Sequence, residues 1–295
     1  MKHLIGMESN AFVSNNEFSI DFEKFKELGI DALDYQGLAT VNNLFSLSND
    51  EFNDYFARLH NELGKYDLKI VQLHALWDPI YEFEHQNEDV FPYYEKAVIA
   101  ASILKASYVV MHPVPIKGHY LWEKVDYQEI ASLNKDFIKR LLPIAKKHGV
   151  YIAIENLPFL ELEELFSPNG TLDFVLDIKD ENVVMCLDTG HFNMFKEAKI
   201  YEFLIKGKDK IRCLHIHDNN GFTDSHSIPY MGTFDWEMFL KGLKDINFDG
   251  VLSLETKIPT NGLSDDAYRL LNRGLITILK DFRNELDDEY GKCRK

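Results

Sequence analysis

The sequence predicts a single (β/α)8 barrel domain that spans residues 1–295. Short β-rich runs alternate with longer amphipathic stretches, and eight such repeats favour a closed barrel over an open sheet. No linker rich in Pro, Gly or Ser divides the chain. With 295 residues, 45% of them hydrophobic, the chain is large enough to bury one barrel core.

The predicted strands are short runs rich in apolar and β-branched residues. In chain order they are HLIGME (3–8), DALDYQ (31–36), KIVQLHA (69–75), SYVVMHP (107–113), GVYIAIEN (149–156), NVVMCLD (182–188), IRCLHIHD (211–218) and GVLSLET (250–256). A helical pattern follows each run, and the last of these patterns covers residues 265–286.

The stretch 134–149 illustrates the predicted helices. Phe137 and Leu141 lie on one apolar face at helical spacing. Gly149 follows the last turn, where a left-handed residue commonly ends a helix, and Gly29 has the same place before the second strand. Pro143 conflicts with this pattern, and we expect it to bend the helix.

Charge and cysteine content restrict the function and the location. The formal net charge is −16, which argues against nucleic acid as a partner. Cys186 and Cys213 lie inside apolar runs and are expected to be buried thiols, whereas Cys293 lies near the end of the sequence. Few cysteines and no signal-like start predict a cytoplasmic protein, and no apolar run is long enough to span a membrane.

Two long segments, about 77–92 and 113–126, follow the third and fourth predicted strands and carry aromatic residues. These are Trp77, Phe83, Phe91, Tyr120 and Trp122. Loops at this end of a barrel surround the active site. The aromatic side chains could form the wall of a pocket or could cover the barrel, and the sequence leaves both interpretations open.

Polar side chains of the types that bind metals occur at six consecutive predicted strand ends. They are His74, His112, Glu155, Asp188, His217 and Glu255; His191 follows one turn after Asp188, and Asp224 and His226 lie in the next long loop. Catalytic groups of barrels lie at these strand ends. A single one of these residues could be a helix cap or a hydrogen-bonded core residue. Six in succession predict a common site.

Three carboxylates in one cavity would repel one another unless a cation or protons compensate their charge. Oxygen and imidazole ligands without thiolate are suited to Mn²⁺, Mg²⁺, Co²⁺ or Zn²⁺. We therefore expect a divalent metal site rather than a purely structural hydrogen-bond network.

The motifs IEN, LDTGH, HIHDNNGFTDSHSIPYMGTFDW and LSLET resemble the xylose-isomerase-like TIM-barrel superfamily. This group of sugar and sugar phosphate isomerases and epimerases also contains the abasic-site endonucleases (AP-endonuclease family 2). The resemblance extends over essentially the whole chain, and residues 215–236 are its most specific part.

The resemblance implies roles for individual residues. Glu155, Asp188, His217 and Glu255 match the ligands of the single divalent metal in the ketose 3-epimerase-like members, where Mn²⁺ is the expected ion. His191 matches a histidine that contacts substrate. His74, His112, His191, Asp224 and His226 also match positions that hold additional zinc ions in the endonuclease branch, so a second metal is an open alternative to substrate contacts.

The sequence also departs from the family pattern. Tyr230 in PYMG replaces a glycine that many relatives have. The arginine that epimerase-like members carry in this loop is not evident in DNNGFTDSHSIP. These departures affect the substrate pocket, so the substrate preference does not follow from the resemblance.

The leading hypothesis is a metal-dependent isomerase or epimerase of a small sugar or polyol. The metal would stabilise an enediolate, and Glu155 and Glu255 would transfer protons on its two faces. The last helix begins with Asp265 and Asp266, which would occupy a phosphate site at its N-terminus; this favours an unphosphorylated substrate, although Lys257 lies nearby. We expect no nucleic acid or membrane partner, and a homodimer would be typical of such barrels.

Three alternative functions remain. A related lyase, such as a dehydratase or a subunit that cleaves carbon-linked sugars, would use the same enediolate chemistry. A metallohydrolase of the abasic endonuclease type is favoured by the extra ligand-like residues and opposed by the net charge. A sugar-binding protein without catalysis would not need two opposed carboxylates.

Overall fold

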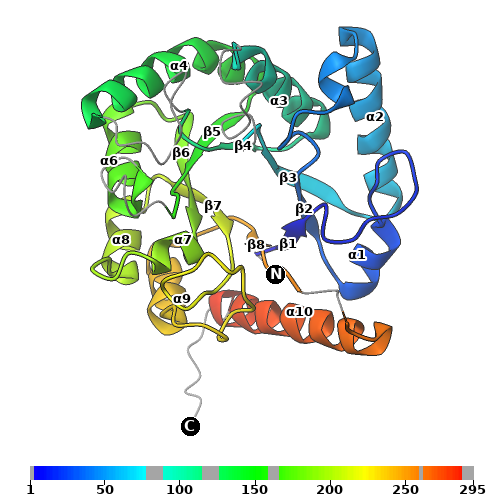
Figure 1. The fold of residues 1–295 in the computed structure, drawn as a ribbon, viewed down its shortest axis with the longest axis vertical. Coiled ribbons are helices and arrows are strands. Elements are labelled where there is room, and N and C mark those ends of the chain that lie inside the picture. The colour runs from blue at the N-terminus through cyan, green and yellow to red at the C-terminus, as the bar shows by residue number, and fades with distance from the viewer. Residues whose placement is uncertain (1–2, 78–88, 115–125, 159–165, 259–261, 288–295) are drawn as a thin grey trace.

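The computed structural model describes residues 3–77, 89–114, 126–158, 166–258 and 262–287, and they form a (β/α)8 barrel, as predicted (Figure 1). The parallel strands follow the order β7-β6-β5-β4-β3-β2-β1-β8. A parallel bridge between Ile216 and Leu254 joins the two outermost strands. The Ile216 amide donates to the carbonyl of Ser253 at 2.8 Å, and the Glu255 amide donates to that of Ile216 at 3.1 Å. These bonds close the barrel.

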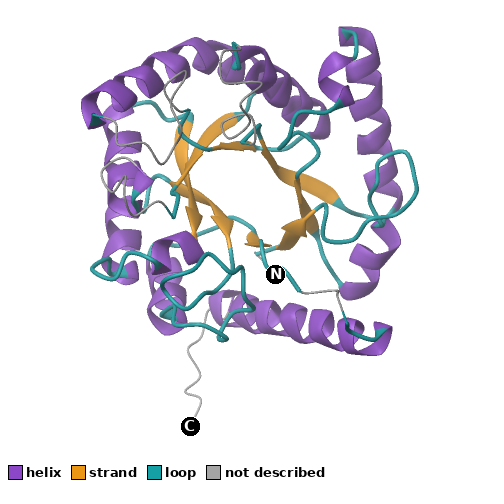
Figure 2. Ribbon diagram, in the orientation of Figure 1, coloured by secondary structure: helices purple, strands orange, loops and turns teal. Residues whose placement is uncertain are grey.

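Every predicted strand overlaps an observed one. The strands are β1 (Ile5–Glu8), β2 (Ala32–Tyr35), β3 (Lys69–His74), β4 (Tyr108–Met111), β5 (Tyr151–Glu155), β6 (Val183–Asp188), β7 (Ile211–His215) and β8 (Leu252–Leu254). Figure 2 shows them as an inner ring with the helices outside.

The outer layer consists of helices that follow the strands. In the described residues these are α1 (Phe22–Leu28), the 3₁₀-helix η1 (Asn43–Ser46), α2 (Asn49–Lys65), α3 (Phe91–Leu104), α4 (Tyr127–His148), α6 (Pro168–Ile178), α7 (Thr189–Asn193), α8 (Ile200–Gly207), α9 (Trp236–Asp245) and α10 (Asp265–Asp287).

Local sequence signals explain where several helices begin and end. The Ser48 side chain accepts from the amide of Glu51, and the Glu51 carboxylate accepts from that of Ser48, a reciprocal cap for α2. Gly29 and Gly149 end α1 and α4 with φ of 80° and 69°, as predicted from their positions. Pro143 lies inside α4 and does not end it, because the helix continues to His148.

The barrel interior contains an apolar layer beneath a polar one. Val110, Ala153, Val184, Cys186 and Cys213 form a small buried cluster that is distinct from the main core between sheet and helices. Cys186 and Cys213 are buried free thiols, as predicted. They are neighbours in the register between β6 and β7. Because strand side chains alternate between two faces, the next inward residues on these strands lie one layer higher, at the functional end.

The predicted loop aromatics have different places. Trp77 lines the central cavity and lies 6.3 Å from the His112 ring, which supports the pocket interpretation for this residue. Phe91 begins α3 and packs edge-on against Phe137, so it contributes to the shell of helices. Phe83, Tyr120 and Trp122 lie outside the described residues, as does Cys293.

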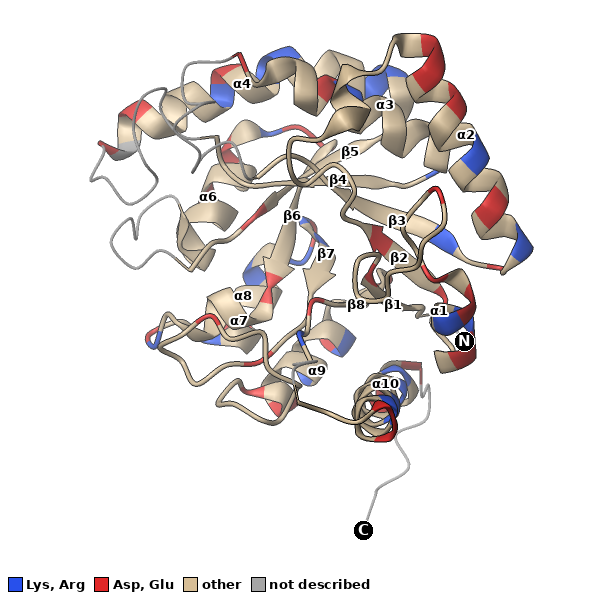
Figure 3. Ribbon diagram, turned by 45° about the vertical axis from the view of Figure 1, so that its right-hand side comes forward, with Lys and Arg blue, Asp and Glu red and all other residues tan. Residues whose placement is uncertain are grey.

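The outer surface carries both charges. Acidic and basic residues alternate along α2 instead of forming one basic stripe (Figure 3). Among the described helices, none combines the length and the apolar character that crossing a bilayer requires.

Candidate metal centre and active-site cavity

Three groups of metal-type side chains converge at the C-terminal ends of the strands. The first contains Glu155, Asp188, His215 and Glu255; the second contains His74, His112 and Glu155; the third contains His191, His217, Asp224 and His226. Within each group the potential ligand atoms lie within 4.8 Å of one another. Glu155 belongs to the first two groups, and His217 of the third lies 2.9 Å from Asp188 of the first, so the groups form one continuous site.

The first group is centred on His215, the last residue of β7. Its Nδ1 lies 3.0 Å from Oε1 of Glu155 and 2.9 Å from Oε2 of Glu255. Register explains this level, because His215 is the Cα partner of Asp188 across β6 and β7. The four side chains therefore reach the same point from β5, β6, β7 and the end of β8.

Two buried residues below the site orient His215. Its Nε2 lies 2.9 Å from Oδ2 of Asp34, and the Gln72 amide nitrogen donates to the same oxygen at 2.8 Å. An imidazole whose Nε2 donates to a carboxylate has Nδ1 free to bind a cation. Asp34 and Gln72 are thus placed to hold His215 in a ligating tautomer.

The structure places a second histidine beside the predicted ligand set, in which His217 stays a prediction. The sequence analysis named His217 with Glu155, Asp188 and Glu255, whereas the structure groups His215 with these carboxylates and places His217 in the third group. Both histidines have inward parity. Strand β7 ends at His215, which is the Cα partner of Asp188. His217 still contacts the first group, because its Nε2 lies 2.9 Å from Oδ2 of Asp188.

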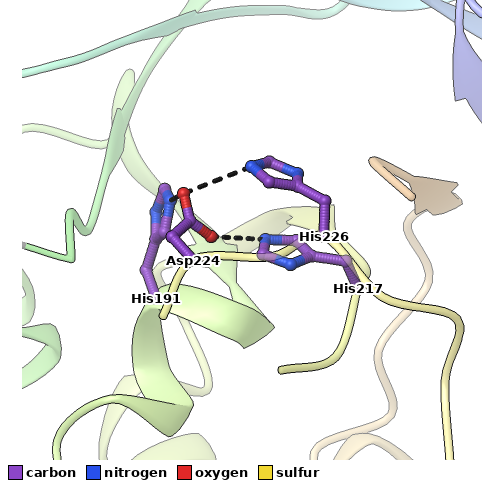
Figure 4. Close-up of side chains that lie close together, drawn as sticks. All are labelled: His191, His217, Asp224 and His226. Atoms are coloured by element: carbon purple, nitrogen blue, oxygen red, sulfur yellow. Dashed lines mark hydrogen bonds and ion pairs between the residues drawn. The ribbon is translucent and has the colours of Figure 1, made fainter. Parts of the chain in front are cut away.

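The third group surrounds the carboxylate of Asp224 (Figure 4). Oδ2 of Asp224 lies 3.3 Å from Nε2 of His191 and 3.2 Å from Nε2 of His226. His217 and His226 are stacked, with ring centroids 4.1 Å apart. The other nitrogen of His191 bonds the carbonyl of Asn156, and that of His226 bonds the carbonyl of Glu255. The ring nitrogens that face Asp224 are therefore fixed in direction.

The second group joins β3 and β4 to β5. Nε2 of His74 lies 3.2 Å from Oε2 of Glu155, and Nε2 of His112 lies 3.5 Å from the same oxygen. Nδ1 of His74 bonds the carbonyl of Ala75 at 2.8 Å. The structure thus brings every predicted site residue into one cluster, with His215 as an additional member.

Burial and neighbouring charges shift the pKa values of several groups in the cluster. Burial disfavours imidazolium, yet Asp188 and Asp224 raise the pKa of His191 to about 10. Burial disfavours the charged form of Glu155, but the neighbouring His215 and His112 hold the pKa of this carboxyl group well below its usual range. Both shifts arise because imidazole and carboxylate groups lie close together in a buried cluster.

The donor set fits a divalent cation. Oε2 of Glu255 is buried and makes no hydrogen bond with any described residue, although Nδ1 of His215 is near it. The buried Nδ1 atoms of His112 and His217 also have no partner in the described part of the chain. Carboxylate oxygens and imidazole nitrogens around one point suit Mn²⁺, Zn²⁺ or a similar ion, whose charge would offset that of the carboxylates.

A cavity of about 640 Å³ opens above this cluster. Its wall contains His74, His112, Glu155, His191, Asp224, His226 and Glu255, together with Trp77, Leu157 and Pro158 on the apolar side. The volume is typical of a small-molecule site. The polar and apolar parts of the wall suit a ligand with several hydroxyl groups and a carbon skeleton.

Sequence reasoning missed four residues of this site: Glu8, Asp34, Gln72 and His215. Asp34 and Gln72 are buried. Each precedes by two positions a residue of its own chain segment that lines the cavity, Gln36 and His74 respectively. Period-two alternation along the strands would have identified all four as inward residues.

Comparisons with known proteins identify the family. Residues 22–273 match the family model described as xylose isomerase-like TIM barrel. The chain belongs to this family. A solved D-tagatose 3-epimerase-like protein has 26% identity and a TM-score of 0.72, and the match covers 97% of this chain and 99% of that one.

Relatives in sequence span smaller parts of the chain. An uncharacterized protein of Methanocaldococcus jannaschii is 33% identical over 162 residues, which is 55% of this chain and 54% of the relative. The chain thus matches only about half the length of this archaeal relative. An inosose isomerase of Bacillus licheniformis is 25% identical over 216 residues, covering 71% of this chain and 73% of the relative. The named relatives in this family are thus sugar epimerases and isomerases.

Proposed function

We propose that the protein is a divalent-metal-dependent isomerase or epimerase of a small sugar or polyol. One observation carries the proposal: carboxylates from β5 and β8 flank the same nitrogen of His215, at 3.0 and 2.9 Å. Two carboxylates on either side of one ligand point can serve opposite faces of a flat intermediate. A non-catalytic sugar-binding protein would have no need of this arrangement.

Glu155, Asp188, His215 and Glu255 would hold the ion, which we expect to be Mn²⁺, with Mg²⁺, Co²⁺ and Zn²⁺ as alternatives. When bound, it would polarise a substrate carbonyl and stabilise negative charge on oxygen. Zinc is present in the solved structure of the IOLI protein, whose 21% identity and TM-score of 0.70 indicate a shared fold.

Glu155 and Glu255 would act on the carbon next to the carbonyl. One carboxylate removes the proton from one face, and the other returns a proton to the opposite face for epimerisation. Return to the adjacent carbon would give isomerisation. His74, His112, His191 and His226 then hydrogen-bond the substrate hydroxyl groups from the cavity wall, or bind a second ion with Glu155 and Asp224.

The substrate is proposed to be unphosphorylated. Asp265 and Asp266 lie in the first turn of α10, as expected from the sequence, and their charges oppose a phosphate at that helix end. Lys257 lines the cavity as a single cation nearby. Kinetic preference for a sugar phosphate over its parent sugar would contradict this part of the proposal.

The decisive experiment is solvent deuterium exchange. The protein loaded with Mn²⁺, Mg²⁺, Co²⁺ or Zn²⁺ is incubated in D₂O with a panel of ketoses, inososes and their phosphates, and carbon-bound deuterium is measured by NMR. We expect exchange next to a carbonyl, and a fall of roughly a hundredfold or more in Glu255→Gln. Equal exchange from both epimers at a near-normal rate in that variant would exclude Glu255 as a base.

The ligand assignment has its own test. His215→Ala should reduce metal content and exchange together, whereas His217→Ala, with Asp188 still in place, should retain the first ion. Elemental analysis of both variants measures this difference. Full occupancy in His215→Ala would show that the assignment to His215 is wrong.

A metallohydrolase of the abasic endonuclease type is the second candidate function. Two further donor groups favour it, because they could hold additional ions. The second group shares Glu155 with the first, and the third lies beside the first. The net charge of −16 opposes it, and we propose that nucleic acid is not a partner. Incision of a duplex with an abasic site by metal-loaded protein, together with anomalous scattering from more than one ion, would favour this function over the first.

A further inference from the structure

The cavity wall is chemically uneven. The ends of β3 to β8 and the loop after β7 carry the metal-type groups. The sector formed by β1, β2 and the segment after β8 carries Glu8, Asn10, Gln36 and Lys257. Glu8 is the last residue of β1 and pairs in register with Asp34 of β2, so it lies beside the site but belongs to none of the three donor groups.

Two polar groups in this sector have no partner. The Glu8 side chain is only 9% exposed and lines the cavity. None of the hydrogen bonds or ion pairs among the described residues involves its carboxyl group. The side-chain nitrogen of Gln36 is buried and also lacks a hydrogen bond within the described part of the chain. Buried polar groups without partners are rare and costly, and when they line a cavity, ligand atoms can satisfy them.

The chemistry of the sector selects the ligand group. The unpartnered atom of Gln36 is the nitrogen of its N–H₂ group, which donates hydrogen bonds and does not coordinate a cation. Anionic ligand groups are disfavoured, because Asp34 and Glu255 both act on Glu8 electrostatically, and they outnumber the one cationic side chain of this sector, Lys257. Glu8 presents carboxyl oxygens to the cavity as acceptors, and Gln36 presents amide N–H donors. A hydroxyl group, itself donor and acceptor, matches both side chains.

We propose that Glu8 and Gln36 form a metal-free subsite that hydrogen-bonds hydroxyl groups of the substrate remote from the reacting carbon. The substrate class is therefore an uncharged polyhydroxylated ketone with free hydroxyl groups at that end. This inference rests on the proposed function for its account of the substrate. Glu8 is a specificity-determining residue in this view, and the proton transfers remain with Glu155 and Glu255.

The test uses binding, so that catalysis is not required. Affinities of the metal-loaded protein for two unreactive polyols, myo-inositol and D-sorbitol, are measured by calorimetry in wild type, Glu8→Ala, Glu8→Gln and Gln36→Ala, with metal content determined in each. We expect both alanine variants to bind the better polyol about tenfold more weakly with unchanged metal content. Glu8→Gln should remain within about threefold, since its amide oxygen is still an acceptor. Glu237→Gln, on exposed α9 surface, is the matched control.

Several outcomes would overturn the subsite. One is wild-type affinity in Glu8→Ala, and another is the failure of wild type to bind either polyol. A loss of metal in Glu8→Ala and Glu8→Gln alike would make Glu8 a support of the metal site instead. The deuterium exchange experiment separates the two proposals. Polyol binding that depends on Glu8 without any exchange would contradict the enzyme alone, and exchange that survives Glu8→Ala with an unchanged KM would contradict the subsite alone.

Discussion

Asp34 shows how a residue that contacts no substrate can control the site. Its carboxylate accepts from Nε2 of His215 at 2.9 Å, and it is fully buried. In Asp34→Asn, the amide can donate to that nitrogen and favour the tautomer with the proton on Nδ1. We expect metal affinity to fall by about 10- to 100-fold, the range seen for such supporting carboxylates. Titration with Mn²⁺ followed by elemental analysis measures the change.

A matched variant distinguishes this effect from general destabilisation. Asp249→Asn, at an exposed carboxylate far from the cluster, should bind metal as wild type does. Unaltered affinity in Asp34→Asn would mean that His215 ligates through another geometry or not at all.

Glu8 predicts a pH dependence of stability. Its folded pKa of about 8 lies above the ordinary 4.5, so the folded state holds a proton that the unfolded chain releases. Stability therefore decreases as pH rises through this window, by up to about 1.4 kcal/mol per pH unit from this group. Glu8→Gln removes the contribution. In metal-free protein, urea unfolding should show a gain for Glu8→Gln that is absent near pH 4.5, grows toward pH 8 and is constant above it. A gain that does not change with pH would contradict the assignment.

The sequence identifies the types of residue in the site, but it does not give their level along the barrel axis. Alternation identifies His215 and His217 equally as inward residues. Only the register between β6 and β7, with its irregularity at Met185 and Cys186, shows that His215 is level with Asp188. Such register depends on tertiary pairing and cannot be read from one strand.

Among the elements, the short helix α7 is the tightest part of the site. A Cβ added at Gly190 would lie 2.0 Å from Cε1 of His217, a contact that neither α7 nor the buried ring can avoid without moving. We expect Gly190→Ala to destabilise the fold by about 1–3 kcal/mol and to displace His217. Urea unfolding and metal content measure the two effects.

Gly64 provides the control for this substitution. It lies in α2 with open space around the position of a Cβ, so Gly64→Ala should stabilise the protein by about 0.5–1 kcal/mol through helix propensity alone. Similar effects of the two substitutions would show that the contact with His217 is easily relieved.

The loop after β7 accommodates Tyr230, which stands where many members of the family have glycine. Tyr230 adopts a φ of 72°, the left-handed region that favours glycine. Its amide donates to Asp218, and its ring contacts Trp236 and Phe282. The loop thus keeps the backbone conformation suited to glycine while its tyrosine packs against the outer shell.

For the whole molecule, the fold was predictable because its signals are repeated. Eight strand-like runs with intervening amphipathic stretches give a barrel even if one boundary is misplaced. The site was predictable in outline for the same reason, since the strand ends of a barrel converge. The groups that support it, Asp34 and Gln72, were not singled out. Alternation along the strand gives their side chains an inward direction, but it does not show that they contact His215 from a neighbouring strand.

The concentration of carboxylates at one end of the barrel predicts how the molecule responds to metal. Without an ion, the neighbouring Glu155, Asp188, Asp224 and Glu255 would repel one another unless protons compensate their charge. A divalent ion that binds only the folded state stabilises it by about 2.7 kcal/mol at a hundredfold excess over its Kd. For a chain of 295 residues we expect Mn²⁺ to raise the Tm by about 5 °C or more and EDTA to reverse the increase. The increase should grow with the logarithm of the Mn²⁺ concentration and should be much smaller in His215→Ala. Scanning calorimetry measures it, and a Tm that neither Mn²⁺ nor EDTA changes would mean that the clustered carboxylates are compensated by protons alone.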